Sequence, residues 1–301
     1  MTDFKGNTAI VTGSAHGIGL EICKECGRRG MNVVMSDIDM KTLETVSKEV
    51  LAAGAPEVLC VYCDVTKLEC IEDLVKQAQD KFGTIEMYFS NAGVTALGDI
   101  FNIPQRDIEF CMKTDFYSVY YGLKTIIPVM RRQRKPCHIE VTASAASITT
   151  CPGMPFYYAA KHAVIGLCEP VYFDLLTWGD DIGMTILCPG MVQTDINTCD
   201  DRRPEQFKPD PNDPYYQSMV YKLGRKASDN DISRGQTPED VVKKLFESIE
   251  KKKLYCLPFE DLGDGRAELW LSRRTDVILG KRQYDIAEFS NFVKHDGADK
   301  K

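Results

Sequence analysis

The chain has 301 residues, of which 44% are hydrophobic and 27% are charged, and its formal net charge is −7. This length allows one large core, and the composition is ordinary for a soluble domain. The negative charge argues against nucleic acid and anionic membranes as partners, and no apolar run approaches the roughly twenty residues of a membrane span, so we expect a cytoplasmic protein.

The twelve cysteines include two pairs with the C-x-x-C spacing, Cys23 with Cys26 and Cys60 with Cys63. That spacing also occurs in zinc sites. The second pair falls in an expected strand, where an offset of three residues directs the two thiols to opposite faces. The first pair falls in an expected helix, where small thiols pack as hydrophobic groups. We therefore expect neither a metal site nor a disulfide framework.

The first expected strand covers residues 8–11, and the sequence Thr-Gly-Ser-Ala-His-Gly-Ile-Gly follows it at residues 12–19. A helix then begins, with Ile18 and Ile22 on one stripe. A strand, a glycine-rich turn and a helix together are typical of a phosphate-binding loop. Glycine lets the backbone approach a pyrophosphate, and the N–H groups at the helix start attract its charge.

Strands and helices then alternate along the chain, which predicts an α/β fold with a doubly wound parallel sheet and helices on both faces. One helix is expected to begin at Thr66, with Glu69 as its capping-box partner, and another at Thr237. The remaining strands are predicted at residues 32–36, 58–65, 85–89, 138–142, 182–187 and 254–257, with long helices at 41–52, 105–132 and from 156 onward.

Residues 197–231 differ from the rest, because polar residues and prolines at positions 204, 209, 211 and 214 precede three tyrosines. Proline disfavours helices and central strands. We expect an irregular lid over the site that is mobile without ligand and orders when ligands bind. A single catalytic domain is expected over residues 1–260, and residues 261–301 form a C-terminal extension that ends in a solvated tail.

Asp37 ends the second strand, at the carboxyl edge of the expected sheet. A carboxylate at this place can accept the hydroxyl protons of an adenosine ribose. It also repels a 2′-phosphate, and the following residue, Ile38, provides no compensating charge. The sequence therefore favours NAD over NADP. Asp37 is also a candidate N-cap for the helix that follows.

Tyr157 and Lys161 are four residues apart on a predicted helix, so their side chains project from the same face. A phenol has a pKa near 10 and needs it lowered by about three to act as a base near neutrality. A neighbouring ammonium stabilises the phenolate and lowers its pKa. Ser144, at the end of an expected strand, can hydrogen-bond the same substrate oxygen.

With these motifs in order, residues 5–258 resemble the short-chain dehydrogenase/reductase family, whose fold is a Rossmann-type domain. The resemblance assigns catalysis to Ser144, Tyr157 and Lys161, and it implies that Lys161 also holds the nicotinamide ribose. It further implies contacts with NAD from the glycine loop, from the pair that contacts adenine, from the N-A-G motif that steadies the sheet and from the segment that holds the nicotinamide. These residues are Gly13, Ser14, His16, Gly17, Ile18 and Gly19, then Asp64 and Val65, then Asn91, Ala92 and Gly93, and finally Pro189, Gly190, Val192 and Thr194.

Two positions depart from the family pattern. Asp115 stands where the family has an asparagine that completes a proton relay to the lysine. The relay implied by the resemblance uses the backbone carbonyl there, so it survives, but a buried carboxylate needs other donors or a proton. Pro170 lies within the helix of Tyr157 and clashes with the carbonyl of Gly166. That helix is a usual subunit contact in the family.

The sequence thus predicts an NAD-dependent oxidoreductase that interconverts a secondary alcohol and a ketone, as a homodimer or homotetramer. Aromatic and methionine side chains favour a bulky apolar substrate such as a hydroxysteroid or a bile acid. A sugar or small polar alcohol is the alternative substrate, and a redox sensor or scaffold without turnover is the alternative class of protein. The candidate substrate contacts, besides Ser144, are Met154, Phe156, Tyr215, Tyr216, Met219 and Tyr221.

Overall fold

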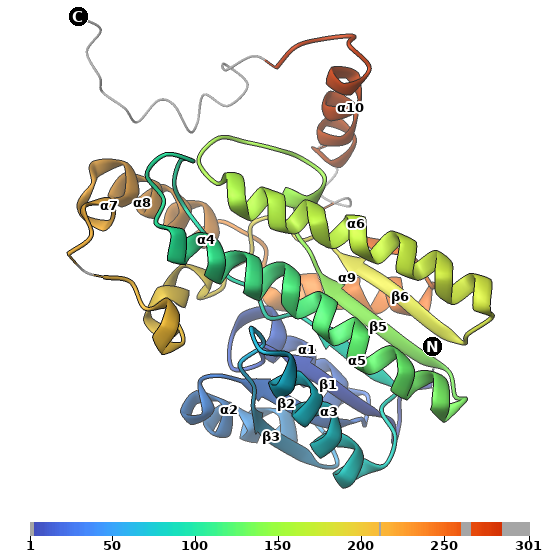
Figure 1. Cartoon of the computed structure of the whole chain (residues 1–301). Helices are drawn as coiled ribbons and strands as arrows, with labels where there is room; N and C mark the ends of the chain where they lie inside the picture. The colour runs from blue at the N-terminus through green and yellow to red at the C-terminus, as the bar shows by residue number, and fades with distance from the viewer. Residues whose placement is uncertain (1–2, 211, 260–265, 285–301) are drawn as a thin grey trace, which may run out of the picture.

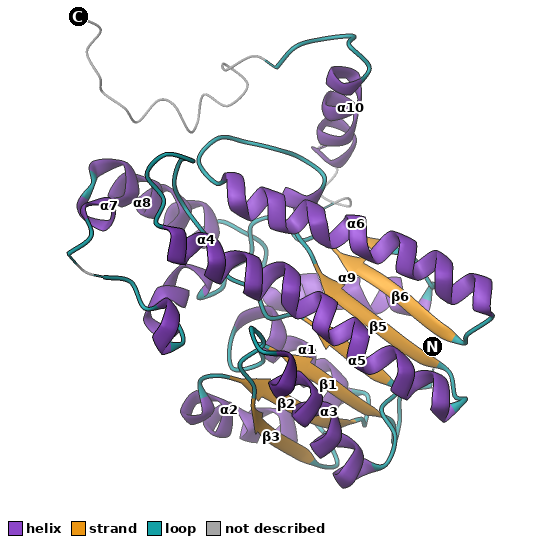
Figure 2. Ribbon diagram, in the orientation of Figure 1, coloured by secondary structure: helices purple, strands orange, loops and turns teal. Residues whose placement is uncertain are grey.

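A computed structural model describes residues 3–210, 212–259 and 266–284. Within them the strands form one parallel sheet in the order β3-β2-β1-β4-β5-β6-β7 (Figures 1 and 2). The strands are β1 (Thr8–Thr12), β2 (Asn32–Asp37), β3 (Val58–Tyr62), β4 (Met87–Ser90), β5 (Cys137–Thr142), β6 (Ile182–Leu187) and β7 (Tyr255–Cys256). The predicted doubly wound parallel sheet is confirmed.

Helices cover both faces of this sheet, as Figure 2 shows. They are α1 (Gly17–Arg28), α2 (Met40–Ala52), α3 (Leu68–Phe82), α4 (Gln105–Met112), α5 (Ser118–Gln133), α6 (Pro155–Trp178), α7 (Pro214–Gln217), α8 (Met219–Ser233), α9 (Pro238–Glu250) and α10 (Arg266–Ile278). Helices α3, α5 and α6 pack on one face, and α1, α2 and α9 pack on the other.

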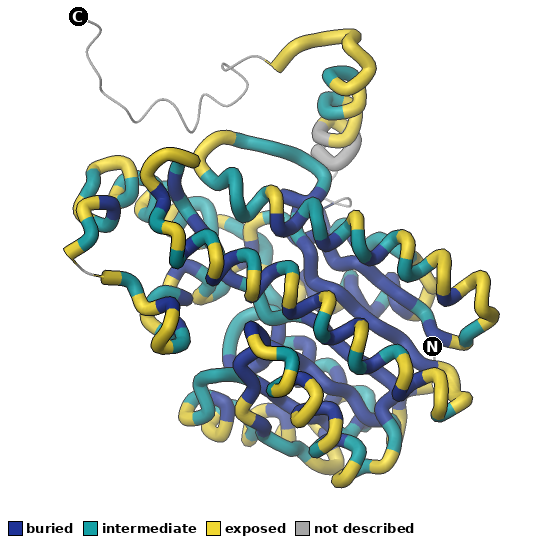
Figure 3. The backbone as a smooth tube through the Cα atoms, viewed as in Figure 1, coloured by how far each residue is buried: buried dark blue, intermediate teal, exposed yellow. Residues whose placement is uncertain are grey.

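Strands β1, β2, β4, β5 and β6 are almost wholly buried on both sides, which explains why they are continuous apolar runs rather than alternating ones (Figure 3). Ile10 and Tyr88 face one helical layer, and Val11 and Phe89 face the other. Strand β1 pairs with β2 on one side and with β4 on the other. The order of the strands in the sheet therefore reverses at β1. Ligands of such sheets bind in the crevice at the carboxyl ends of the strands beside this reversal.

Strand β3 is shorter than predicted, and Thr66 does not cap α3. The Asp64 carboxylate accepts hydrogen bonds from the Thr66 N–H (3.1 Å) and hydroxyl (2.6 Å), so the chain turns directly after the strand. Lys67 takes the N-cap position without a side-chain bond. The predicted cap at Thr237 is confirmed, since its hydroxyl accepts the Asp240 N–H at 3.1 Å.

The predicted helix over residues 105–132 is interrupted by one π-helical turn, Lys113–Tyr117, between α4 and α5. Such turns insert one extra residue and are frequent at functional sites. In contrast, Pro170 does not break α6, which continues over 24 residues. The position where a side chain of Gly166 would lie has no neighbouring atom within 4 Å, so the helix has room to adjust around the proline ring.

The expected irregular lid is instead largely helical, and this prediction was wrong. Short 3-10 helices cover Ile196–Arg202 and Glu205–Phe207, and α7 and α8 follow. Pro214 occupies the first turn of α7, behind the Asp213 cap, where a missing N–H removes no helical hydrogen bond. Proline therefore starts these helices rather than preventing them. Pro211 lies outside the described residues.

The C-terminal extension contains α10, and Arg274 on this helix contacts His162 on α6. The solvated tail predicted at the end of the chain lies outside the described residues, which stop at 284. In the described part of the chain, no helix is long and apolar enough to cross a membrane.

All twelve cysteines are free thiols. Cys23 and Cys26 are fully buried in the core beneath α1, as predicted. Cys60 and Cys63 pack into the cores on opposite faces of the sheet, which confirms the interpretation of their spacing. Among residues 3–210, 212–259 and 266–284, no three histidine, cysteine, aspartate or glutamate side chains gather as metal ligands.

Candidate active site

Ser144, Tyr157 and Lys161 meet at the carboxyl end of β5. Ser144 follows that strand and caps the short 3-10 helix Ala145–Ser147, its hydroxyl accepting the Ala146 N–H at 3.1 Å. Helix α6 places Tyr157 in its first turn and Lys161 one turn later, with the ammonium 5.8 Å from the centre of the tyrosine ring. The predicted constellation is thus brought together in space.

Lys161 is buried, and two oxygen groups hold its ammonium. It donates to the Thr142 carbonyl at 3.3 Å and lies 3.4 Å from Oδ1 of Asp115. Burial acts to lower the pKa of Lys161, but the charges of Asp115 and Tyr157 outweigh it, and the pKa is raised. The side chain is therefore a fixed cation at neutral pH.

Asp115 has the donors that a buried carboxylate requires. The π-helical turn directs it toward the N-A-G loop, where it accepts the Val94 N–H at 3.0 Å, and the Cys111 thiol donates to it at 3.4 Å. Burial raises the pKa of Asp115, and Lys161 and the Val94 N–H oppose this rise. The carboxylate thus belongs to the same buried network as Lys161.

The pKa of Tyr157 is raised above its ordinary value rather than lowered. Burial is the largest cause, and Asp115 adds to it. Lys161 acts in the predicted direction, as does a hydrogen bond with Ser144, but together they do not overcome burial. The expectation of a pKa shifted toward neutrality was therefore wrong in its net direction.

The glycine loop is built so that only glycine fits. Gly13 and Gly17 have φ angles of 64° and 52°, in the left-handed region that favours glycine. A Cβ on Gly13 would lie 2.7 Å from the Cα of Ala92, and one on Gly19 would lie 2.2 Å from the Gly13 carbonyl oxygen. His16 takes the N-cap position of α1 without a side-chain bond, so the first N–H groups of the helix remain available to an anion.

Two side chains join this loop to β2. The N–H and the hydroxyl of Ser14 both donate to the Ser36 carbonyl, at 3.1 and 3.2 Å. Asp37 accepts the Ala15 N–H with one carboxylate oxygen and the Asp39 N–H with the other, each at 3.0 Å. Asp39, not Asp37, caps α2. Asp37 is thus held in place, half-buried, at the edge of the loop.

Asn91 joins the ends of β4 and β1. Its amide nitrogen donates to the carbonyls of Thr12 (3.0 Å) and Gly13 (3.1 Å). In return, the Thr12 hydroxyl accepts the backbone N–H groups of Asn91 and Ala92. A Cβ on Gly93 would lie 3.0 Å from Oδ1 of Asp115, so this loop approaches the buried Asp115–Lys161 pair closely.

The segment after β6 lies against the glycine loop. The Pro189 carbonyl accepts the Ala145 N–H at 2.8 Å, and Val192 is buried. A Cβ on Gly17 would lie 2.9 Å from the Thr194 methyl group. His16 continues this contact, with Nδ1 at 3.0 Å from Oδ2 of Asp195 and Nε2 at 3.6 Å from Oδ2 of Asp39.

The other residues assigned to the cofactor lie around this loop. Ile18 packs into the core behind it. Gly190 faces Phe259, whose ring is 3.5 Å from the position of a glycine Cβ. Asp64 and Val65 are buried at the end of β3, and one Asp64 oxygen lies 3.4 Å from the ammonium of Lys67. Beside Thr194, a cavity of about 380 Å³ opens between the start of the lid segment and the end of α8.

The proposed substrate residues divide into two groups. Phe156 and three lid tyrosines, Tyr215, Tyr216 and Tyr221, pack with Tyr157 in one apolar cluster. Met219 is 67% exposed and lies outside it, and Met154 is half-buried at the N-cap of α6. The Tyr215 hydroxyl donates to the Leu97 carbonyl and that of Tyr216 to Asp107 (2.6 Å), so these hydroxyls tie residues 197–231 to the body of the domain.

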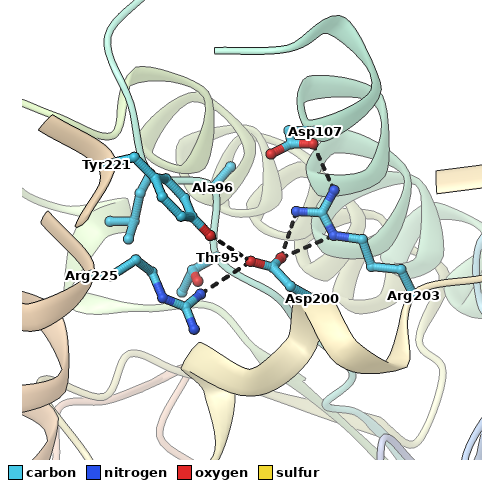
Figure 4. Close-up of a pocket in the computed structure, with 8 residues that line it drawn as sticks. Thr95, Ala96, Asp107, Asp200, Arg203, Tyr221 and Arg225 are labelled. Atoms are coloured by element: carbon cyan, nitrogen blue, oxygen red, sulfur yellow. Dashed lines mark hydrogen bonds and ion pairs between the residues drawn. The ribbon is translucent and has the colours of Figure 1, made fainter. Parts of the chain in front are cut away.

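A charged cluster that the sequence analysis did not predict joins residues 197–231 to α4 (Figure 4). The Arg203 side chain is 2% exposed and donates to Asp107 at 2.6 Å. Asp200 accepts from Arg203, Arg225 (3.2 Å) and the Tyr221 hydroxyl (3.0 Å). Residues 200–203 form a polar run that in sequence resembles a solvated loop, so no periodic signal indicates burial.

Comparison with known proteins identifies the family of this chain. The family described as short chain dehydrogenase matches residues 7–204. The chain is 38% identical over 257 residues to a CLA biosynthesis dehydrogenase/reductase of Lactiplantibacillus plantarum, covering 85% of this chain and 89% of that protein. It is 27% identical to 11-beta-hydroxysteroid dehydrogenase A of Sesamum indicum, over 64% of this chain and 55% of that one.

A solved structure extends the likeness over nearly the whole fold. It is a short chain dehydrogenase/reductase of Burkholderia phymatum in complex with NAD, 29% identical, with a TM-score of 0.87 over 95% of this chain and 99% of that one. In this chain the glycine loop lies against the N-A-G loop, and Ser144 after β5 lies close to Tyr157 and Lys161 of α6. The chain belongs to the short-chain dehydrogenase/reductase family and is an oxidoreductase of that type.

Proposed function

We propose that this oxidoreductase interconverts a secondary alcohol and a ketone with NAD(H), at the site formed by Ser144, Tyr157 and Lys161. The observation that carries the proposal is the position of the Tyr157 ring, 5.8 Å from a buried ammonium and beside the Ser144 hydroxyl. A phenol, a cation and a hydroxyl arranged in this way suit proton transfer to and from a substrate oxygen.

The residues around the glycine loop fit a dinucleotide. The uncapped N-terminus of α1 would hold the pyrophosphate, and Asp37 would accept the hydroxyl protons of the adenosine ribose. Thr194 would lie beside the nicotinamide end. The complex of the Burkholderia phymatum relative with NAD supports this choice of cofactor. Asp37 followed by Ile38 disfavours the 2′-phosphate of NADP.

When bound, the cofactor supplies or accepts the hydride. Tyr157 donates its phenolic proton to the carbonyl oxygen during reduction and recovers a proton from the alcohol during oxidation. Ser144 holds that oxygen by hydrogen bonding. Lys161 stabilises the phenolate, because its ammonium is fixed by Thr142 and Asp115. In the relay that the family resemblance implies, the backbone carbonyl at position 115 would hold a water molecule, and the proton would reach Lys161 through that water.

The substrate is a bulky apolar alcohol of the hydroxysteroid or bile acid kind. Phe156 and the lid tyrosines present ring surface beside Tyr157. The charges of Asp107, Asp200, Arg203 and Arg225 are paired with one another, so this buried cluster is not free to bind a sugar. The name of the Sesamum indicum relative supports the hydroxysteroid class. We further propose that residues 197–231 act as the lid of this site.

The test compares Tyr157→Phe with Tyr158→Phe, in assays with NADH and ketosteroids, or with NAD and hydroxysteroids, polyols and aliphatic alcohols. The first variant should retain NADH binding but lose roughly 10²–10⁴-fold in turnover. The control loses only a hydroxyl that bonds Cys151, so its turnover should remain within about threefold. If Tyr157→Phe keeps near-normal turnover, another residue is the acid/base.

Cofactor choice is tested by titrating the protein with NADH and NADPH. NADH should bind at least about tenfold more tightly, and Asp37→Asn should narrow the difference by reducing repulsion of the 2′-phosphate. Equal affinities in the wild type would overturn the role of Asp37.

We also propose a homodimer or homotetramer in the cytoplasm. On α6, Phe173 and Leu176 are 62% and 57% exposed. Tyr120 on α5 and Tyr117 at the end of the preceding π-helical turn are also exposed, so two helical segments present apolar surface. Twelve free thiols are typical of a reducing compartment. Light scattering on the purified protein would measure the assembly directly, and a monomer at every concentration would overturn this part.

A further inference from the structure

A carboxyl group lies in the middle of the sheet, away from the substrate. Glu140 on β5 has no exposed surface. Its Oε1 lies 2.8 Å from the hydroxyl oxygen of Thr142, two residues further on the same strand. Its Oε2 is also buried and has no hydrogen-bond partner among the described residues. Burying a polar group without partners is unfavourable, so this position calls for an explanation.

The Thr142 hydroxyl connects Glu140 to the glycine loop. It lies 3.3 Å from Oδ1 of Asn91, whose amide nitrogen donates to the carbonyls of Thr12 and Gly13. Those two carbonyls can only accept, so the nitrogen of the Asn91 amide must face them. Its oxygen must then face Thr142 and needs a donor there.

Counting protons decides the state of Glu140. The Thr142 hydroxyl has one proton, yet it lies within hydrogen-bond distance of two oxygens. If Glu140 is a carboxylate, it accepts the hydrogen bond of the Thr142 hydroxyl. The Asn91 oxygen then faces a lone pair of that hydroxyl and has no donor. If Glu140 carries a proton, it donates to Thr142, and Thr142 donates to Asn91. Only the neutral acid gives each contact one donor and one acceptor.

We propose that Glu140, as a neutral acid, is a positioning residue for the dinucleotide, because its proton directs the hydrogen bonds from Thr142 to Asn91 and the glycine loop. Glu140 touches neither the substrate nor the cofactor. It acts by keeping the carbonyls of Thr12 and Gly13 turned toward the Asn91 amide. The inference rests on the proposed binding of NAD(H) at this loop.

The surroundings of Glu140 agree with a neutral acid. Burial raises its pKa from 4.5 to about 8, although Thr142 and Lys161 act to lower it. The other titratable groups near it are the thiols of Cys168, Cys188 and Cys256, which are themselves buried. The folded protein thus holds a proton that the unfolded chain releases near pH 4.5. The stabilisation from this proton is fully present below that pH and is lost as the pH rises through about 8.

The test measures the dissociation constant of NADH by fluorescence titration from about pH 6 to about pH 9.5, in the wild type and in Glu140→Gln. Wild-type affinity should fall about five- to tenfold over this range, the effect of one lost hydrogen bond. Glu140→Gln should vary less than about twofold, because an amide donates to Thr142 at every pH.

Thr142→Val supplies a second variant that removes the connecting hydroxyl and leaves Glu140 in place. It should bind NADH more weakly than wild type at low pH and show no fall on raising the pH. A wild type that binds no NADH at any pH would overturn the proposed function together with this inference. NADH binding whose pH dependence is the same in wild type and Glu140→Gln would overturn this inference alone.

Discussion

The cofactor side and the lid are held in place by different kinds of interaction. Around the glycine loop, backbone groups bond to small buried side chains, as when Asn91 holds the carbonyls of Thr12 and Gly13. Residues 197–231 are held instead by long charged side chains, above all the Arg203–Asp107 pair, whose members are 96 residues apart in sequence. Helix α8 contributes no buried residue.

This difference indicates that the two parts respond differently to change. The glycine loop is formed by backbone groups in fixed conformations. It is therefore rigid and tolerates few substitutions. Residues 197–231 are held by charged pairs and by a tyrosine cluster outside the main core, so they can separate from the body as a unit at a lower cost than opening of the core. We therefore expect cofactor affinity to respond most to changes in the glycine loop, and access of substrate to respond most to changes in residues 197–231.

The largest effect is expected for Gly19→Ala. Its Cβ would lie 2.2 Å from the Gly13 carbonyl oxygen and 2.5 Å from the Asn91 amide nitrogen, so the loop must move. Since a displacement of about 1 Å is enough to spoil preorganised contacts, we expect NADH affinity to fall about 100-fold or more by titration.

Gly166→Ala is the matched control for this variant. It lies on α6 with no neighbouring atom within 4 Å of the new Cβ, and it should leave NADH affinity unchanged. If the NADH affinity of Gly19→Ala is within a few-fold of wild type, the glycine loop adjusts easily to an added side chain and is not more rigid than residues 197–231.

The lid should be loosened most by Arg203→Met, which leaves Asp107 and Asp200 without their shared buried cation. Breaking a buried ion pair costs about 3–5 kcal/mol. We expect faster hydrogen exchange across residues 197–231 and a KM for substrate raised about tenfold or more, with NADH affinity within about threefold of wild type.

Arg202→Met is the control, because Arg202 is only partly buried and bonds the Asp195 carbonyl at the surface. Its exchange rates and KM should match those of wild type. Unchanged exchange in Arg203→Met would mean that the tyrosine cluster alone fixes this segment.

At the boundary of the two parts, Asp115→Asn should have a moderate effect on pH dependence. Asp115 raises the pKa of Tyr157, so its removal should lower that pKa and shift the rising limb of the pH profile for alcohol oxidation to lower pH. Turnover near pH 7 should stay within about threefold of wild type or rise, since the backbone carbonyl remains. Cys111→Ala keeps the carboxylate and should leave the limb in place. A loss of more than tenfold in Asp115→Asn would show instead that the carboxylate itself carries protons.

The smallest effect is expected for Gly224→Ala on α8, where no atom lies within 4 Å of the new Cβ. Alanine stabilises a helix interior over glycine by about 0.5–1 kcal/mol. Hydrogen exchange within α8 should slow about two- to fivefold while NADH affinity stays the same.

Gly83→Ala, at a φ of +80°, should destabilise the protein instead. Faster exchange in Gly224→Ala would show that the helix conformation is not what limits opening.

Sequence reasoning succeeded where structure depends on local signals. Apolar runs gave the strands, and the spacing of Ser144, Tyr157 and Lys161 gave a group that does meet in space. It failed where the structure depends on contacts between side chains that are distant in sequence. An arginine in a polar run is expected at the surface. Only the fold brings Asp107 to Arg203 and buries the pair. Glu140 was missed although a charge within an apolar strand is a visible signal.

The contact of Gly17 with Thr194 would couple the binding of NADH to the binding of substrate. Because the Thr194 methyl lies against the turn that would hold the pyrophosphate, and His16 pairs with Asp195, the position of the lid's first residues depends on the loop. Coupling between two sites is reciprocal. If bound NADH raises the affinity for substrate about tenfold through this contact, bound substrate must raise the affinity for NADH by the same factor, and affinities measured on the binary complexes would then understate those of the ternary complex.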